Sequence, residues 1–158
     1  MEFQHYYNVE VNWDKDRKGV MCSPELNLSN CDTDNCIEVA TPPEFPKGIP
    51  GIWSPEHLFT ASVSSCLMTT FLSIAENSKL EFTNFTCKSK GKLEQVDGCF
   101  MMSEIILEPT VTILHEKDRE RAERIVKKSE TACLITNSIR SKITLNITVK
   151  VNKEQVAV

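Results

Sequence analysis

The sequence lacks a strong excess of charge of either sign. Its 158 residues carry 18 lysines and arginines against 22 aspartates and glutamates, a formal net charge of -4. Nucleic-acid-binding domains concentrate basic residues on one face, and this weak negative balance does not provide such a surface. We therefore expect no DNA or RNA partner. The length and the 41% hydrophobic content predict one globular domain, residues 1–158.

The first eight residues, MEFQHYYN, lack the basic segment and the apolar core of a secretory signal. We therefore expect a cytoplasmic protein. Its seven cysteines are many for this length, and an odd number cannot all pair with one another. In a reducing compartment, thiols persist as core residues, metal ligands or catalytic groups. Structural disulfides are therefore the least expected use of these cysteines.

The segment 58–75 lacks any charged residue. Just before it, Ser54, Pro55 and Glu56 are typical of a helix start, because they supply a capping oxygen, a fixed φ angle and a carboxylate near the positive helix end. The segment is long enough to raise the question of a membrane span. Its seven serines and threonines, however, make it less apolar than such a span. We predict a central helix buried on all sides, and no membrane partner.

The remaining pattern predicts an α+β fold rather than a wound parallel sheet. Apolar and polar residues alternate in several segments, and Asp97-Gly98 favours a tight hairpin turn. The expected strands are 3–13 (with Tyr7, Val9, Val11 and Trp13 on one side), 20–28, 37–40, 82–96, 100–114 and 142–151. An irregular proline-rich loop is expected over 41–54, an amphipathic helix over 116–130 and a short helix over 133–139.

Two cysteines are candidates for chemistry. Cys66 lies in the middle of the uncharged helix, where a cysteine is often a small inert core residue. Cys133 stands where a short helix should begin, and the N–H groups there could stabilise a thiolate and lower its pKa. An ordinary buried thiol is the alternative for Cys133 as well.

Taken together, the segments PEHLFTASVSSC (55–66) and CLITNSI (133–139) resemble the superfamily of osmotically inducible protein C and organic hydroperoxide resistance protein. The resemblance implies antiparallel sheets wrapped around two central helices in an intertwined homodimer. It also implies that Cys66 attacks a peroxide and that Cys133 resolves the product. The family's glutamate and arginine match Glu56 and, less closely, Arg17.

A guanidinium held by a carboxylate can stabilise a thiolate and bind a peroxide. Alternatively, Glu56 only complements the helix dipole and Arg17 only occupies a solvated turn. Ten helical residues separate Glu56 from Cys66, a rise of about 15 Å, so the two side chains cannot meet within one straight helix. If both serve one site, the carboxylate must come from another chain, as the family's dimer implies.

The resemblance implies a thiol peroxidase that reduces organic hydroperoxides through a Cys66 sulfenic acid and a Cys66–Cys133 disulfide. A lipoyl-type dithiol or a thioredoxin-like protein would then reduce that disulfide, with no metal or organic cofactor. Leu134 departs from the proline that many relatives carry after the second cysteine. The other five thiols, Cys22, Cys31, Cys36, Cys87 and Cys99, are expected to be incidental.

Two alternatives remain open. One is a non-enzymatic domain of the same fold that binds a small apolar or thiol-bearing molecule. The other uses Cys31 and Cys36 as a redox pair or as half of a zinc site, although no second ligand pair with suitable spacing follows them.

Overall fold

The computed structural model describes residues 4–26 and 35–152. The chain forms two compact units, Met1–Leu58 and Phe59–Val158. The single-domain count over 1–158 stays a prediction.

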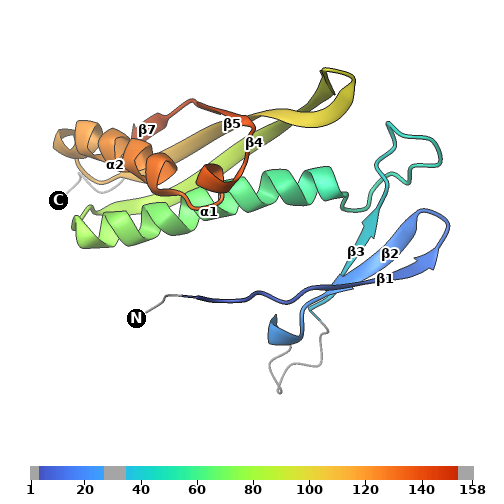
Figure 1. The fold of residues 1–158 in the computed structure, drawn as a ribbon. Coiled ribbons are helices and arrows are strands. Elements are labelled where there is room, and N and C mark those ends of the chain that lie inside the picture. The colour runs from blue at the N-terminus through green and yellow to red at the C-terminus, as the bar shows by residue number, and fades with distance from the viewer. Residues whose placement is uncertain (1–3, 27–34, 153–158) are drawn as a thin grey trace. The chain divides into compact units, whose positions relative to one another are not determined.

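The first unit is built on a three-stranded antiparallel sheet in the order β1-β2-β3, with β1 Glu10–Lys15, β2 Lys18–Cys22 and β3 Ile37–Ala40 (Figure 1). A short 3-10 turn, η1 Pro24–Leu26, follows β2. The proline-rich stretch after β3 is a loop, as expected, and the Ala40 N–H donates to the Trp53 carbonyl at 2.8 Å.

The expected strand 3–13 is corrected by the structure. The pairing of the first strand begins only at Glu10. The strand expected over 20–28 is β2, which ends at Cys22, and residues 27–28 lie outside the described residues. Tyr7 and Trp13, predicted on a buried side, are 85% and 77% exposed, and Val9 and Val11 are also exposed. The first unit by itself therefore has no layer that covers this apolar row.

A disulfide joins Cys22 at the end of β2 to Cys36 just before β3. This finding corrects two expectations, that a structural disulfide is the least expected use of the cysteines and that these two cysteines are incidental. The alternation of residue types gives no sign of the pairing, because β2 and β3 become neighbours only through the sheet register that pairs Met21 with Ile37. Cys31 lies outside the described residues, and the alternative of a Cys31–Cys36 redox pair is wrong in this structure, because Cys36 is bonded to Cys22.

The long helix α1 Pro55–Asn77 begins where the sequence predicts. The His57 N–H donates to the Ser54 Oγ at 3.3 Å, which caps the first turn. By length and composition α1 could cross a membrane, but the core helix of a soluble protein meets the same criteria.

The prediction that α1 is buried on all sides is wrong for the single chain. Only one stripe is buried, with residues at every fourth position: Val63, Leu67, Phe71 and Ala75. On the other side, Met68 and Leu72 are 39% and 42% exposed. Apolar side chains thus lie on two faces of the helix, and one of these faces has no cover within the described chain.

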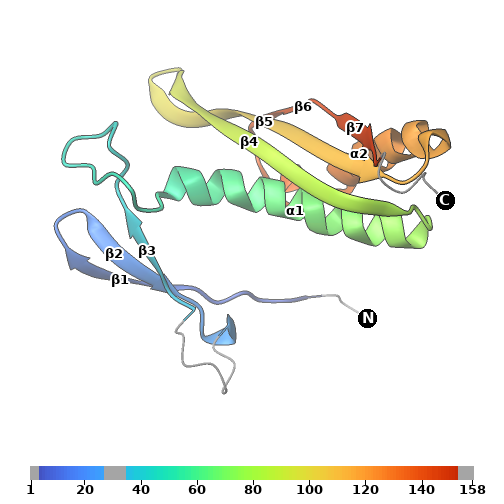
Figure 2. The same ribbon diagram turned by 180° about the vertical axis from the view of Figure 1, so that it is seen from behind.

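The second unit contains a long hairpin of β4 Phe82–Val96 and β5 Cys99–Ile113, along which α1 runs (Figure 2). The turn is Asp97-Gly98, as predicted, and both residues have positive φ angles of 50° and 80°, which a two-residue turn of this type requires. Gly91 lets helix and hairpin approach closely, because a Cβ there would lie 2.3 Å from the Thr60 Oγ1 and 2.4 Å from the Met102 Cε.

A 3-10 turn, η2 Glu116–Asp118, leads into the amphipathic helix α2 Arg119–Ala132. The buried residues of α2 are the predicted ones, Ala122, Ile125, Val126 and Ser129. Ala122, Ile125 and Val126 share a core cluster with Phe71 and Ala75 of α1. Val111 and Ile113 of β5 belong to the same cluster, so both helices pack on one face of the sheet.

The expected strand 142–151 is two strands, β6 Lys142–Leu145 and β7 Thr148–Val151. Both pair with β5, and both pairings are parallel, which corrects the expectation of purely antiparallel sheets. The expected helix 133–139 is only a 3-10 turn, η3 Thr136–Ser138. The α+β class, with two helices and mixed sheets, is confirmed.

Candidate active site

Two of the four predicted site residues, Cys66 and Cys133, lie side by side in the second unit. Their sulfur atoms share a hydrogen bond although the residues come from different elements. Cys66 projects from α1 and is half-buried, while Cys133 follows α2 and is fully buried. The structure therefore provides a thiol pair with one member accessible to a small molecule.

The surroundings of Cys66 favour its thiolate. Burial raises the pKa of Cys66, but hydrogen bonds to its sulfur act in the opposite direction and outweigh burial. They come from the Cys133 thiol, the Ile135 N–H, the Thr70 hydroxyl and the Leu134 N–H, and together they lower the pKa of Cys66 below its ordinary value. Because the thiolate is the nucleophilic form of cysteine, Cys66 is the more reactive of the pair.

Cys133 shows the opposite behaviour, which corrects a prediction. Burial and the hydrogen bond with Cys66 raise the pKa of Cys133, while donation from the Thr136 N–H lowers it in smaller measure. The expected helix start, which was to stabilise a Cys133 thiolate, is absent. The N–H groups of Leu134 and Ile135 stabilise Cys66 instead. Cys133 is thus the protonated donor of the pair.

The turn after α2 holds these donors in place. Cys133 is extended (φ -66°, ψ 115°) and ends α2, with its N–H donating to the Glu130 carbonyl at 3.1 Å. The Thr136 N–H lies 3.5 Å from the Cys133 Sγ, and the Asn137 N–H donates to the Cys133 carbonyl at 3.1 Å. The Asn137 side chain also bonds the Thr131 carbonyl at 3.1 Å. These bonds orient the backbone that faces Cys66.

Glu56 and Arg17 lie elsewhere in the chain. Glu56 is in the first turn of α1, ten residues before Cys66, so the helix separates the two by about 15 Å. Arg17 is exposed in the turn between β1 and β2, and its carbonyl accepts from the Thr41 N–H at 3.1 Å. It lines a hollow of about 330 Å³ in the first unit, together with Val11, Trp13, Lys18, Gly19, Val39, Ala40 and Pro55. The roles of Glu56 and Arg17 stay predictions.

The zinc alternative loses one of its ligands, because Cys36 is bonded to Cys22. Within the described residues, 4–26 and 35–152, no group of three or more His, Cys, Asp or Glu residues gathers as a metal site would require. Burial raises the pKa of Cys87, so this thiol is less reactive than Cys66. Cys99 is a free, exposed thiol near the hairpin turn.

Sequence reasoning missed three contributors to the site. Thr70 follows Cys66 by four residues, a spacing that places both on one helix face and could have been recognised. The N–H groups of Leu134 and Ile135 could not have been recognised from the sequence, because nearly every residue has a backbone N–H. Their contribution depends on how the backbone turns after α2.

The fold and the paired thiols of Cys66 and Cys133 define the class of protein, an α+β protein with a two-cysteine site. A model of the OsmC-like protein family matches residues 48–148, which include Cys66 and Cys133. The chain belongs to the OsmC-like family.

A curated relative, the uncharacterized protein YmaD of Bacillus subtilis, is 23% identical over 146 residues, which cover 90% of this chain and 92% of YmaD. Among solved structures, an OsmC-like protein of unknown function from Vibrio cholerae is similar with a TM-score of 0.78 and 20% identity, over 91% of this chain and 99% of that one. An organic hydroperoxide resistance protein from Elizabethkingia anophelis is similar with a TM-score of 0.72 and 22% identity, over 96% and 100%. At these identities the structural likeness shows the shared fold.

Proposed function

We propose that the protein is a thiol peroxidase that reduces organic hydroperoxides, with Cys66 as the nucleophile and Cys133 as the resolving thiol. The observation that carries the proposal is the hydrogen bond from a protonated Cys133 to a Cys66 whose pKa is lowered. A peroxidatic cysteine must be ionised, and its resolving partner must lie within bonding reach. Similar structures include proteins described as organic hydroperoxide resistance proteins.

In the proposed reaction, the Cys66 thiolate attacks the terminal oxygen of the hydroperoxide. The O–O bond breaks, sulfur gives up two electrons, and the alkoxide takes a proton and leaves as an alcohol. The resulting Cys66 sulfenic acid condenses with the Cys133 thiol, which forms the disulfide and releases water. An external dithiol, of the lipoyl or thioredoxin-like type, returns both cysteines to thiols by exchange.

We propose further that two copies form an intertwined cytoplasmic homodimer in which Glu56 and Arg17 reach the thiol pair of the other copy. The uncovered face of α1, with Met68 and Leu72, supports this assembly, as does the exposed row that contains Tyr7 and Trp13. Burial of apolar side chains is the main driving force of association. The spacing of Glu56 and Cys66 on one helix supports the exchange between copies.

The test is dithiol-dependent consumption of cumene hydroperoxide by the wild type, Cys66→Ser and Cys87→Ser, where Cys87 serves as a matched control thiol. We expect turnover by the wild type and the control, and loss to background in Cys66→Ser. Mass spectrometry after one equivalent of peroxide, without reductant, should find a Cys66–Cys133 disulfide. Equal rates for wild type and Cys66→Ser would exclude the enzyme and leave a binding domain of the same fold.

A further inference from the structure

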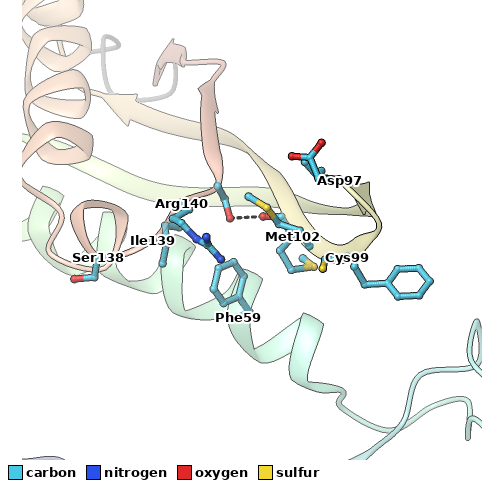
Figure 3. A pocket seen from close by; sticks show the side chains of 11 residues that line it. Phe59, Asp97, Cys99, Met102, Ser138, Ile139 and Arg140 are labelled. Atoms are coloured by element: carbon cyan, nitrogen blue, oxygen red, sulfur yellow. Dashed lines mark hydrogen bonds between the residues drawn. The ribbon is translucent and has the colours of Figure 1, made fainter.

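The second unit contains a cavity of about 610 Å³ that is lined by neither Cys66 nor Cys133 (Figure 3). It lies between the tip of the β4–β5 hairpin, the first turns of α1 and the segment after η3. Its volume falls within the range of pockets that hold small organic molecules. Its lining residues are Phe59, Val96, Asp97, Cys99, Phe100, Met101, Met102, Ser138, Ile139, Arg140 and Ser141.

Most of this lining is apolar and part of it is adaptable. Two aromatic rings, two methionines, a valine and an isoleucine face the cavity. Phe100 is 64% exposed, so an apolar ligand would remove it from water. Methionine side chains are flexible and polarizable, and they fit apolar groups of varied shape. The walls therefore suit a hydrocarbon chain or ring.

Arg140 supplies a single cation to this cavity. Figure 3 shows it extending from the segment after η3 toward Phe59. Within the described part of the chain, no salt bridge engages Arg140, whereas the nearby Lys142 lies 3.8 Å from Glu104. Asp97, the other charged lining residue, lies across the cavity near the hairpin turn, with its carboxylate turned away from Phe59 (Figure 3). An anion at Arg140 would thus meet an unused guanidinium.

The wall that carries Arg140 is anchored to the hairpin. The neighbouring Ser141 hydroxyl donates to the Met102 carbonyl at 2.5 Å, the dashed line in Figure 3. The first strand after Arg140, β6, pairs in parallel with β5 from Lys142 onward. A guanidinium on an anchored segment loses less freedom when it binds a ligand, which favours affinity.

We propose that this cavity binds an apolar carboxylate, with its carboxylate on Arg140 and its hydrocarbon part against Phe59, Phe100 and Met102. One guanidinium matches one carboxylate through two parallel hydrogen bonds. A phosphate would require further cations, which the lining does not supply. Within one chain the site is separate from the thiol pair, because Phe59 precedes Cys66 by seven residues, about 10 Å along α1.

The test is isothermal titration of the full chain with dodecanoate and with dodecanol. We expect the wild type to bind dodecanoate at least about tenfold more tightly than dodecanol, and Arg140→Gln to abolish that difference. Arg140→Lys should retain part of it, because it keeps the charge but not the paired donors. Arg124→Gln, an exposed arginine on α2, is the matched control and should bind as the wild type does.

Two variants separate this site from the proposed peroxidase and from the apolar walls. Cys66→Ser should bind dodecanoate normally even though it has no peroxidase activity. Phe59→Ala should weaken dodecanoate and dodecanol alike, because it removes an apolar contact only. The proposal is overturned if the wild type does not bind dodecanoate, if both ligands bind equally well, or if Arg140→Gln binds dodecanoate as tightly as the wild type.

Discussion

The Cys133 thiol donates a hydrogen bond to the Cys66 sulfur, and the two cysteines have pKa values displaced in opposite directions. The pKa of Cys66 is lowered because four donors outweigh the effect of burial. The pKa of Cys133 is raised by burial and by its hydrogen bond to Cys66. Since only one of two neighbouring thiols ionises easily, the pair is divided into a readily ionised thiol and a proton-bearing partner.

Removing the Cys133 donor should make Cys66 less acidic. In Cys133→Ala, we expect the pKa of Cys66 to rise and its alkylation by iodoacetamide at neutral pH to slow several-fold, because a hydrogen bond to a charged acceptor is lost. Cys133→Ser retains a hydroxyl donor, so its alkylation rate should lie nearer the wild type. The measurement is the alkylation rate against pH, with the modified peptide identified by mass spectrometry. Identical profiles for the alanine and serine variants would contradict the role of the donor.

The reaction of the reduced protein with peroxide should depend on pH through Cys66. The pKa of this group is lowered in the folded protein, so the thiolate is present above the folded pKa and is lost as the pH falls through it. We therefore expect the second-order rate constant to decline toward acid with an apparent pKa below that of an unperturbed cysteine thiol. Stopped-flow peroxide reduction measures this profile. In Thr70→Val, which removes another donor, the decline should begin at higher pH.

The boundaries of α1, the hairpin and the buried face of α2 could be predicted because they depend on local signals. Ser54 caps α1, Asp97-Gly98 forms the turn, and Ala122 recurs at helical spacing with its core neighbours. Each of these signals acts within a few residues and so is visible in the sequence.

The predictions that were wrong depend on contacts between segments far apart in the sequence, which local sequence patterns do not indicate. The row from Tyr7 to Trp13 has the alternation of a half-buried strand, but nothing in the described single chain covers it. The pairing of Cys22 with Cys36 depends on which strands become neighbours. Of the candidate site, Cys66 and Cys133 could be named from sequence. The N–H donors of Leu134 and Ile135 could not, because backbone direction after α2 decides where they point.

The Cys22–Cys36 disulfide should stabilise the first unit. It closes a loop of sequence separation 14, and a loop of about this length gives roughly 3 kcal/mol in the chain-entropy account. We expect the double variant Cys22→Ser/Cys36→Ser to unfold at lower urea concentration than the oxidised wild type. Under dithiothreitol the two proteins should unfold at similar concentrations. A wild-type midpoint that dithiothreitol does not change would show that this bond contributes nothing.

Gly91 should be required for the close approach of α1 to the hairpin. A methyl group there would clash with Thr60 and with Met102, so Gly91→Ala should destabilise the protein by about 1–3 kcal/mol. Lys90→Ala, at the neighbouring exposed position, is the control and should be nearly neutral. Urea unfolding of both variants measures the difference. A stable Gly91→Ala protein would mean that the hairpin yields to the helix at low cost.

Glu56 should act on the Cys66 of the other copy if the proposed dimer is correct. Glu56→Gln and Cys66→Ser homodimers should each be nearly inactive. After the two are unfolded together and refolded, random pairing makes half of the dimers mixed. In each mixed dimer one site then combines an intact Cys66 with an intact Glu56 from the other subunit. Peroxidase activity should therefore return to about a quarter of the wild-type value.

The control is Leu72→Glu, which places a charge on the uncovered face of α1. This variant should be monomeric by light scattering and should restore no activity in any mixture. If the mixed Glu56→Gln and Cys66→Ser sample stays inactive while the wild type recovers after the same refolding, the carboxylate does not act between subunits.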